Sequence, residues 1–255
     1  MTKTSAEAGL ARTMIVPLAL AQFIASYAAT NMNVAISAIA TDLDTSVRGP
    51  ADDHHPVHPH HGVLMIPGSK LSDIWGRKFC FIAGLIVYGP GATLAMLSQG
   101  LGLMIFGYSI LEGVGSALMI PPVYILITVA ATDIKTRAKY FGVVSGAGGL
   151  GAAAGPLVGG LVTTAVSWRA SFGLQVLVVV GILVMARKIV DPGRSGPAPR
   201  FDLVGAVLSA AGMFFVVLGI LQSGTYGWLR SRTDFTIGDT TVIPAGGIFR
   251  CGCSS

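Results

Sequence analysis

A charged stretch directly in front of a long apolar run reads Gly68-Ser-Lys-Leu-Ser-Asp73-Ile-Trp-Gly76-Arg77-Lys78. Its glycines permit a tight turn, its acid suits the start of a helix, and its basic pair favours the cytoplasmic side of a membrane. The stretch therefore predicts a short loop at the cytoplasmic ends of two adjacent membrane helices. Taken alone, the pattern also fits an ordinary positively charged loop.

The composition places the chain in a membrane. It has 255 residues, of which 52% are hydrophobic and 11% charged, with 34 glycines and a net charge of +5. Its mean hydropathy is +0.70. A soluble domain carries more charge than this. Because the basic residues are spread through short loops between apolar runs, they indicate membrane orientation and not nucleic-acid binding.

Six apolar runs have the character of membrane helices, which need about 20 residues. They are Met14–Ala40, Phe79–Leu97, Leu101–Ala131, Tyr140–Val166, Leu203–Leu221 and the shorter Ser171–Ala186. We expect each to be helical because unsatisfied backbone groups are costly in hydrocarbon. The first run is too long for a cleaved signal, so we interpret it as a retained span. A seventh run, Thr240–Ile248, stops too early to cross.

One segment breaks this pattern where a second span is expected. Val47–Gly62 contains all five histidines (His54, His55, His58, His60, His61), three prolines and the pair Asp52-Asp53. Proline and central acids make unaided insertion unfavourable. Three interpretations stay open: a His-rich metal-binding loop, an exposed loop, or residues from a shifted reading frame. The last seven residues, which follow the apolar start at Ile243, suggest a similar frame change.

Two motifs carry a family resemblance. The stretch Gly68–Lys78 resembles the signature loop between the second and third helices of the major facilitator superfamily. The run Gly151-Ala-Ala-Ala-Gly155-Pro156-Leu-Val-Gly159-Gly160 is similar to the antiporter motif of its drug and proton antiporters. Its glycines let helix backbones touch, and its proline bends the helix. Trp168-Arg169, Phe201–Gly205 and Tyr226–Trp228 resemble the branch with fourteen spans.

The resemblance implies an all-α, polytopic membrane bundle: the six-helix N-terminal half of a major facilitator fold plus one linker helix. We expect a bundle over 1–190, a cytoplasmic linker over 191–202, a further helix over 203–222, and a loop with the start of another span over 223–255. The implied function is proton-coupled efflux of drugs or amphipathic small molecules across the plasma membrane. We expect one bundle to be inactive alone, because alternating access uses two. Another half-transporter chain is a candidate partner.

Glu112 is the main candidate site residue, since it is the one Asp or Glu in the middle of an apolar run. Intramembrane carboxyl groups commonly carry protons or bind charged substrates, although Glu112 could also be a hydrogen-bonded packing residue. Asn31, Asn33 and Gln22 could line the same cavity or simply hold helices together. The acid that the family's first-helix motif usually carries falls on Ala28. The arginine usual in its fourth span falls on Ser109, and a nearby glutamine position is Glu112.

Basic residues predict the orientation. If the N-terminus is cytoplasmic and the chain crosses between Ala40 and Lys70, the inside holds Lys3, Arg12, Lys70, Arg77, Lys78, Lys135, Arg137, Lys139, Arg187, Lys188, Arg194 and Arg200, and the outside Arg48, Arg169, Arg230 and Arg232. If nothing crosses there, only the N-terminus and Arg48 change sides, so charge barely separates the two topologies.

The other function classes follow from what the sequence offers. We find no nucleophile and base constellation, phosphate loop or zinc-protease motif, so we expect no enzyme, cofactor or resident metal. Cys80, Cys251 and Cys253 form no disulfide framework. Two alternatives to transport stay open: a non-transporting membrane scaffold or regulatory half-transporter, and a membrane metal-handling protein that uses the histidine segment.

Overall fold

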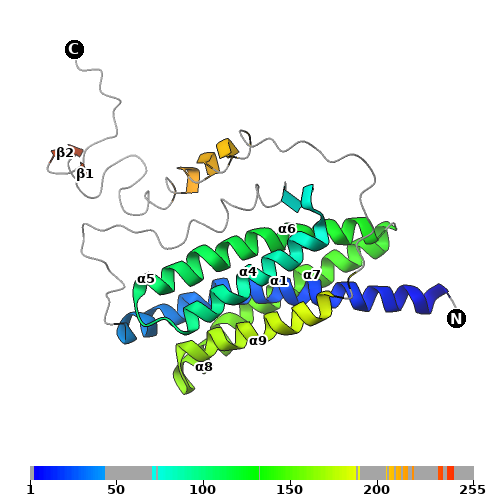
Figure 1. The fold of residues 1–255 in the computed structure, drawn as a ribbon, viewed down its shortest axis with the longest axis horizontal. Helices are drawn as coiled ribbons and strands as arrows, with labels where there is room; N and C mark the ends of the chain where they lie inside the picture. Colours follow the sequence, from blue (N-terminus) through cyan, green and yellow to red (C-terminus); the bar gives the residue numbers. More distant parts are fainter. Residues whose placement is uncertain are drawn as a thin grey trace, which may run out of the picture.

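The structure is a computed structural model that describes residues 3–43, 71–72, 74–131, 133–187 and 189, and, nearer the C-terminus, 205, 207–209, 211–213, 215–217, 220, 235–237 and 240–243. Its main body is a bundle of long helices lying side by side (Figure 1). These are α1 (Lys3–Asp42), α4 (Arg77–Met96), α5 (Leu101–Met104), η1 (Ile105–Glu112), α6 (Gly113–Ala130), α7 (Ile134–Ala154), η2 (Gly155–Gly159), α8 (Gly160–Ala165) and α9 (Trp168–Ala186). The segments η1 and η2 are π-helical turns within two longer helices.

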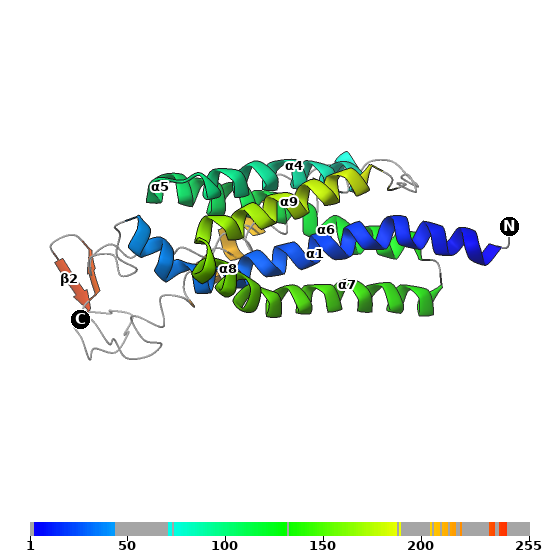
Figure 2. The same ribbon diagram turned by 90° about the horizontal axis from the view of Figure 1, so that it is seen from below.

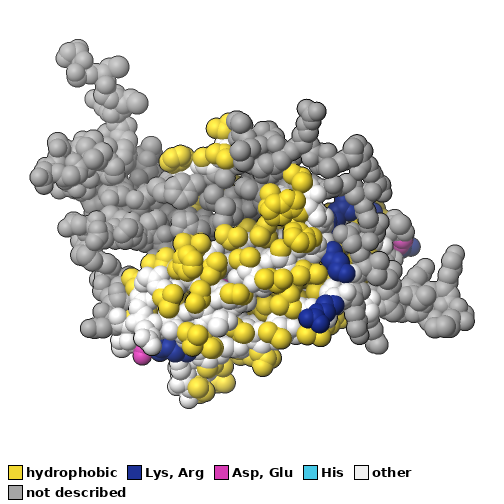
Figure 3. Space-filling model, in the orientation of Figure 1, with side chains coloured by type: hydrophobic (Ala, Val, Ile, Leu, Met, Phe, Trp, Pro, Cys, Tyr) yellow, Lys and Arg dark blue, Asp and Glu magenta, His cyan; other side chains and the backbone are white. Residues whose placement is uncertain are grey.

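Among the described residues, five helices are long and apolar enough to cross a membrane. They are Thr13–Asp42, Arg77–Met96, Leu101–Ala130, Ile134–Ala165 and Trp168–Ala186. Hydrophobic side chains also cover most of the described face of the bundle, with Lys and Arg near its ends (Figure 3). Such a surface suits lipid, because lipid tails solvate apolar side chains that water would not. The predicted helical membrane bundle is therefore confirmed, and the protein crosses the membrane several times.

Contacts at the two ends of the bundle fix the direction of the helices. At one end, the Asp42 carboxylate closes α1 with an ion pair to Arg169 and accepts a 3.1 Å hydrogen bond from Trp168 Nε1, both at the start of α9. At the other end, Lys78 Nζ of α4 donates to the Arg187 carbonyl, 3.3 Å away, just beyond α9. Figure 2 shows α1 and α4 running in the same direction. The chain between them therefore joins opposite ends of the bundle, which favours the topology that crosses between Ala40 and Lys70.

Polar caps define where α7 and α9 begin. The Asp133 carboxylate accepts a 3.0 Å hydrogen bond from the Thr136 amide at the start of α7. Ser167 Oγ accepts one from the Arg169 amide at the start of α9. Such caps satisfy amide groups that a helix leaves unpaired at its first turn. The loops from α6 to α7 and from α8 to α9 are short.

The structure differs from the expected all-helical pattern at a C-terminal hairpin. Strands β1 (Phe235–Ile237) and β2 (Thr240–Ile243) pair antiparallel. We had expected Thr240 to begin a further helix, but β2 is rich in β-branched threonine, valine and isoleucine, which favour extended backbone. The described residues between 205 and 220 are helical, and the predicted span over Leu203–Leu221 stays a prediction. The segment Val47–Gly62 lies outside the described residues.

Candidate functional site in an intramembrane pocket

The signature loop is described only in part. Gly68 and Asp73 lie outside the described residues. Gly76 has a φ of 99°, a left-handed conformation that glycine adopts without strain, and it directly precedes α4. Arg77 is the first residue of α4, and Lys78 bonds to the end of α9 as described above. Lys78 thus joins the start of α4 to the residue just beyond α9. Their role as a conformational switch stays a prediction.

The predicted antiporter motif forms the contact between α7, η2 and α1. An added Cβ at Gly151 would overlap the Phe23 carbonyl oxygen, and one at Gly155 would lie 2.8 Å from the backbone nitrogen of Asn31. At Gly159, a Cβ would overlap the Asn31 side chain. The backbones approach this closely because these positions lack side chains. Gly160 is less constrained, with a methyl group of Val34 at 3.4 Å from its built Cβ.

Pro156 lies in η2, where the α-helical hydrogen-bond pattern gives way to a π-helical one. Proline lacks the amide hydrogen that the regular pattern needs at its position. π-Helical segments are rare in proteins, and those that occur often lie at functional sites. The bend predicted at Pro156 from the sequence stays a prediction.

A second set of glycines brings α4 against η1 and α6. A Cβ at Gly91 would lie 2.9 Å from the Glu112 backbone nitrogen and 2.9 Å from the Gly107 carbonyl oxygen. A Cβ at Gly115 would lie 2.7 Å from the Tyr88 backbone nitrogen. These close approaches place the backbone of Glu112 against Gly91 and that of Tyr88 against Gly115. The glycines therefore position the two side chains that matter most in the pocket.

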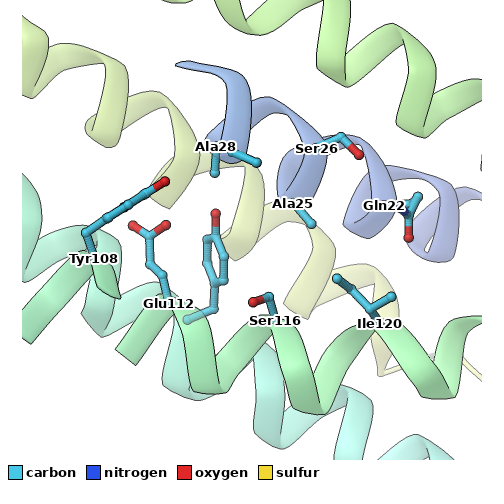
Figure 4. Close-up of a pocket in the computed structure, with 10 residues that line it drawn as sticks. Gln22, Ala25, Ser26, Ala28, Tyr108, Glu112, Ser116 and Ile120 are labelled. Atoms are coloured by element: carbon cyan, nitrogen blue, oxygen red, sulfur yellow. The ribbon is translucent and has the colours of Figure 1, made fainter. Parts of the chain in front are cut away.

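The pocket lies between α1 on one side and α4, η1 and α6 on the other, with a volume of about 200 Å³. It is lined by Gln22, Ala25, Ser26, Ala28, Ala29, Tyr88, Tyr108, Glu112, Ser116 and Ile120. Figure 4 shows Tyr108 and Glu112 beside each other, both pointing toward the helix that carries Ala28. Alanines form much of the α1 wall. The opposite wall supplies the carboxyl group of Glu112 and the aromatic rings of Tyr88 and Tyr108.

Glu112 is the ionisable centre of this pocket. Its side chain is only 1% exposed, and its Oε1 atom has no hydrogen-bond partner. Among the described residues, the ion pair that the structure contains is the one between Asp42 and Arg169, so no described cation pairs with Glu112. A charged carboxylate without a partner is expensive at this depth. Glu112 is thus placed where a proton or a ligand cation would neutralise it.

Three hydrogen bonds join residues of α9 to α4 and α1 at the centre of the bundle. The Tyr88 hydroxyl donates to Gln175 Oε1 at 2.9 Å, and both residues are fully buried. One turn earlier on α9, Ser171 Oγ bonds to the Tyr27 hydroxyl at 2.8 Å and donates to Asn31 Oδ1 at 2.9 Å. The Tyr88 bond borders the pocket, whereas Tyr27, Asn31 and Ser171 do not line it.

The structure divides the predicted polar set. Gln22 and Glu112 line the same pocket. Asn31 is buried in the contact with Ser171 and Gly159, and Asn33 is exposed on the surface of α1. Asn31 therefore has the contacts of a residue that joins helices. Ala28 and Ser109, where the resemblance places an acid and an arginine, are both buried, and Ala28 faces the pocket.

Sequence reasoning missed three residues of this region: Tyr88, Tyr108 and Gln175. Each is a polar or amphipathic side chain in the interior of an apolar run, and buried polar groups normally have partners. A census of such residues in every span would have found them. It could not have shown that Tyr88 and Gln175 meet, because they lie 87 positions apart.

No metal centre is built by the described residues, where no three His, Cys, Asp or Glu side chains gather as metal ligands would. The five histidines of the segment at 47–62 lie outside the described part of the chain. Cys80 is buried in α4 and is a free thiol. The polar groups that line the described pocket are one carboxyl group, two phenols, one amide and two serine hydroxyls.

Membrane-length helices that enclose a pocket with a buried carboxyl group are features of polytopic transporters. Residues 61–252 match the Major Facilitator Superfamily, which is most of the chain, and the protein belongs to that family. The methylenomycin A resistance protein of Bacillus subtilis is 26% identical over 84% of this chain and 46% of its own length. The tetracenomycin C resistance and export protein of Streptomyces glaucescens is 32% identical over 67% of this chain and 32% of its own length.

Solved structures show the same fold. A peptide transporter of the POT type in complex with sulfate matches with a TM-score of 0.61 and 18% identity, over 84% of this chain and 46% of that one. A POT family transporter in complex with 5-aminolevulinic acid matches with a TM-score of 0.57 and 16% identity, over 86% and 47% of the two chains. The chain thus spans less than half the length of these relatives and structures.

Proposed function

We propose that this chain supplies the first helical bundle of an exporter for amphipathic small molecules, and that Glu112 exchanges a proton for the transported compound or its cationic group. The relatives named above are resistance and export proteins for antibiotics, which supports this substrate class. Transport fits a pocket whose wall combines alanines, phenols, serine hydroxyls and one amide around a single carboxyl group.

The observation that carries the proposal is the burial of an unpaired carboxyl group inside a membrane pocket. The acid expected on α1 is absent at Ala28, yet Ala28 faces the pocket that Glu112 enters from the opposite wall. The pocket therefore keeps one carboxyl group, supplied by a different helix. A carboxyl group that is neutral when protonated and attractive to cations when not could alternate between the two ligands.

Alternating access needs a second bundle against which the first can move. The described residues form one bundle, so we propose that export requires a second bundle, and another half-transporter chain is one candidate source of it. We place the N-terminus and the Arg77–Lys78 end of the bundle on the cytoplasmic side of a bacterial-type inner membrane. The basic residues at that end support this orientation.

The proposal is tested by transport and binding together. Expressed in an efflux-deficient host, the 255-residue chain should leave accumulation of ethidium unchanged. Purified in lipid nanodiscs, it should bind ethidium and release protons into a weakly buffered solution. Glu112→Gln should abolish proton release, while the control Asp133→Asn, at the exposed start of α7, should not. Ethidium export by this chain alone would overturn the need for a second bundle, and proton release that survives Glu112→Gln would overturn the role of the carboxyl group.

A further inference from the structure

The intramembrane pocket has two chemically different ends. Figure 4 shows Glu112 and Tyr108 at one end, beside the part of α1 that carries Ala28. Gln22 of α1 and Ile120 of α6 lie at the other end. Ala28 comes six positions after Gln22, and a rise of 1.5 Å per residue separates the two ends by about 9 Å along the helix. The pocket is therefore long enough for one ligand to contact both ends.

Each end presents a buried oxygen atom that lacks a hydrogen-bond partner. These atoms are Oε1 of Glu112 and Oε1 of Gln22, and neither is bonded by any described residue. A carboxylate oxygen and an amide oxygen both accept hydrogen bonds, and buried polar groups normally have partners. Two unsatisfied acceptors in one cavity point to a ligand that supplies a donor to each of them.

The described lining does not satisfy the Gln22 amide oxygen. Besides the two phenols, the hydroxyl groups that line the pocket are those of Ser26 and Ser116. Ser116 Oγ donates to the Gly113 carbonyl at 3.0 Å, and neither serine bonds to Gln22 Oε1. The backbone of α7 comes close to the same side chain, since a Cβ at Gly148 would lie 3.1 Å from Gln22 Cγ. This contact restricts the conformations of the Gln22 side chain and holds its amide at the pocket wall.

The two ends suit different chemical groups. At one end, the Glu112 carboxyl group lies with the phenols Tyr88 and Tyr108, and no described cation forms an ion pair with it. An ionised carboxyl group inside a membrane attracts a cationic group of a ligand. At the other end, the Gln22 amide is uncharged, and its oxygen can accept from a neutral hydroxyl or amine. A ligand with one charged and one uncharged donor would consequently bind in a single orientation.

We propose that Gln22 is a specificity-determining residue: its amide oxygen accepts a hydrogen bond from the uncharged end of an elongated amphipathic cation whose charged end lies at Glu112. The inference rests on the proposed function, in which Glu112 binds the cationic group. The ligand class is a protonated amine that carries a hydroxyl or amine hydrogen about 9 Å from its charge. A cation without that donor leaves Gln22 Oε1 unsatisfied and binds more weakly.

Three amines with equal numbers of non-hydrogen atoms test this: aminooctanol, which can donate from its far end, methoxyheptylamine, which can only accept there, and nonylamine, which can do neither. Scintillation-proximity binding of the tritiated probes is measured on the 255-residue chain in lipid nanodiscs, with empty nanodiscs subtracted. Gln22→Met keeps an unbranched side chain and removes the amide. It should weaken aminooctanol binding about fivefold, as for a neutral hydrogen bond, and leave the other two probes unchanged.

Two further variants complete the design. Asn33→Leu is the matched control, because it removes an exposed amide from the same helix outside the pocket lining, and it should leave the affinity for all three probes unchanged. Glu112→Gln should weaken all three, since each carries the same ammonium group. Comparing one probe between parent and variant cancels its partition into the lipid. Should Gln22→Met fail to fold, Gln22→Leu removes the same amide and gives the same decision.

The outcomes separate this inference from the proposed function. Binding that depends on Glu112 but is the same in the parent and in Gln22→Met would overturn the role of Gln22 and leave the carboxyl site standing. A loss of nonylamine binding in Gln22→Met as large as that of aminooctanol would show a packing effect and reject the hydrogen bond. An equal loss for methoxyheptylamine would mean that the amide donates, which contradicts the proposed acceptor. Binding that survives Glu112→Gln, or no binding of any probe by the parent, would overturn both proposals.

Discussion

Two buried tyrosines reach α9 one turn apart, and their surroundings differ in one decisive respect. Tyr27 bonds to Ser171, which donates onward to Asn31, and this link lies in the packed contact of α1, α9 and η2. Tyr88 bonds to Gln175 and borders a pocket that holds Glu112. Equal burial and the same residue type therefore do not indicate equal roles. What separates the links is an ionisable neighbour with access to a cavity.

The largest effect is expected from a substitution at Gly159, which packs against the Asn31 side chain that Ser171 and Tyr27 hold. Gly159→Ala places a methyl group where the Asn31 amide lies, so Asn31 must leave Ser171 or the helices must separate. We expect a loss of about 2–3 kcal/mol in the free energy of unfolding, as for other overpacked interiors. Reversible unfolding of the purified chain in mixed micelles measures it.

Gly149→Ala is the matched control for that substitution. Gly149 lies in α7, and an added Cβ there would meet nothing within 4 Å. Alanine favours helix over glycine by about 1 kcal/mol, so this variant should be as stable as the parent or more so. Equal destabilisation by both variants would show that the contact with Asn31 is not what makes Gly159 necessary.

The second prediction moves the carboxyl group of the pocket to the opposite wall. Glu112→Gln should weaken ethidium binding at least tenfold, which corresponds to about 1.4 kcal/mol. Adding Ala28→Asp should restore part of the binding and of the proton release, because Ala28 faces the same pocket from α1. Ala35→Asp, at a buried α1 position outside the pocket lining, is the control and should restore neither. Titration calorimetry in nanodiscs distinguishes the variants; no gain from Ala28→Asp would contradict a shared pocket.

Much of the architecture could be predicted from the sequence, because hydrophobic length alone determines which segments can span a bilayer. The glycine positions also predicted helix contact, and the structure places Gly151, Gly155 and Gly159 directly on α1. The hairpin at Phe235–Ile243 could not be anticipated in the same way. A short run of Thr, Val and Ile is apolar enough to suggest a helix start, and only its β-branching favours the strand.

The candidate site was only half predictable. Glu112 stood out because an acid in an apolar run has few explanations. Asn31, Asn33 and Gln22 were grouped with it by proximity in sequence, but helix rotation separates them: one lines the pocket, one is packed against Ser171 and one is exposed. The contacts of Tyr88 depend on α4 and α9 lying side by side. Such pairings between distant segments are set by tertiary packing and leave little trace in one sequence.

The smallest effect is expected from Tyr27→Phe, and its dependence on pH separates the roles of the two tyrosines. Tyr27→Phe removes one hydrogen bond between buried neutral groups, and such bonds within membranes contribute about 0.6 kcal/mol on average. Since Tyr27, Ser171 and Asn31 stay uncharged near pH 7, this cost should be the same in mildly acidic and mildly alkaline buffer. The free energy of unfolding, measured in mixed micelles across that range, should show a constant difference from the parent.

Tyr88→Phe should behave differently in the same measurement. In acidic buffer, where Glu112 is protonated, it removes the neutral bond to Gln175 and should cost about as much as Tyr27→Phe. In alkaline buffer it also removes one of the two phenols, Tyr88 and Tyr108, that line the pocket with Glu112 and could donate to its ionised carboxylate, and hydrogen bonds to charged groups contribute about 1.5–3 kcal/mol. Its cost should therefore rise as the pH rises through the titration of Glu112, and adding Glu112→Gln should flatten it again. Parallel pH profiles for the two tyrosine variants would mean that both links are structural.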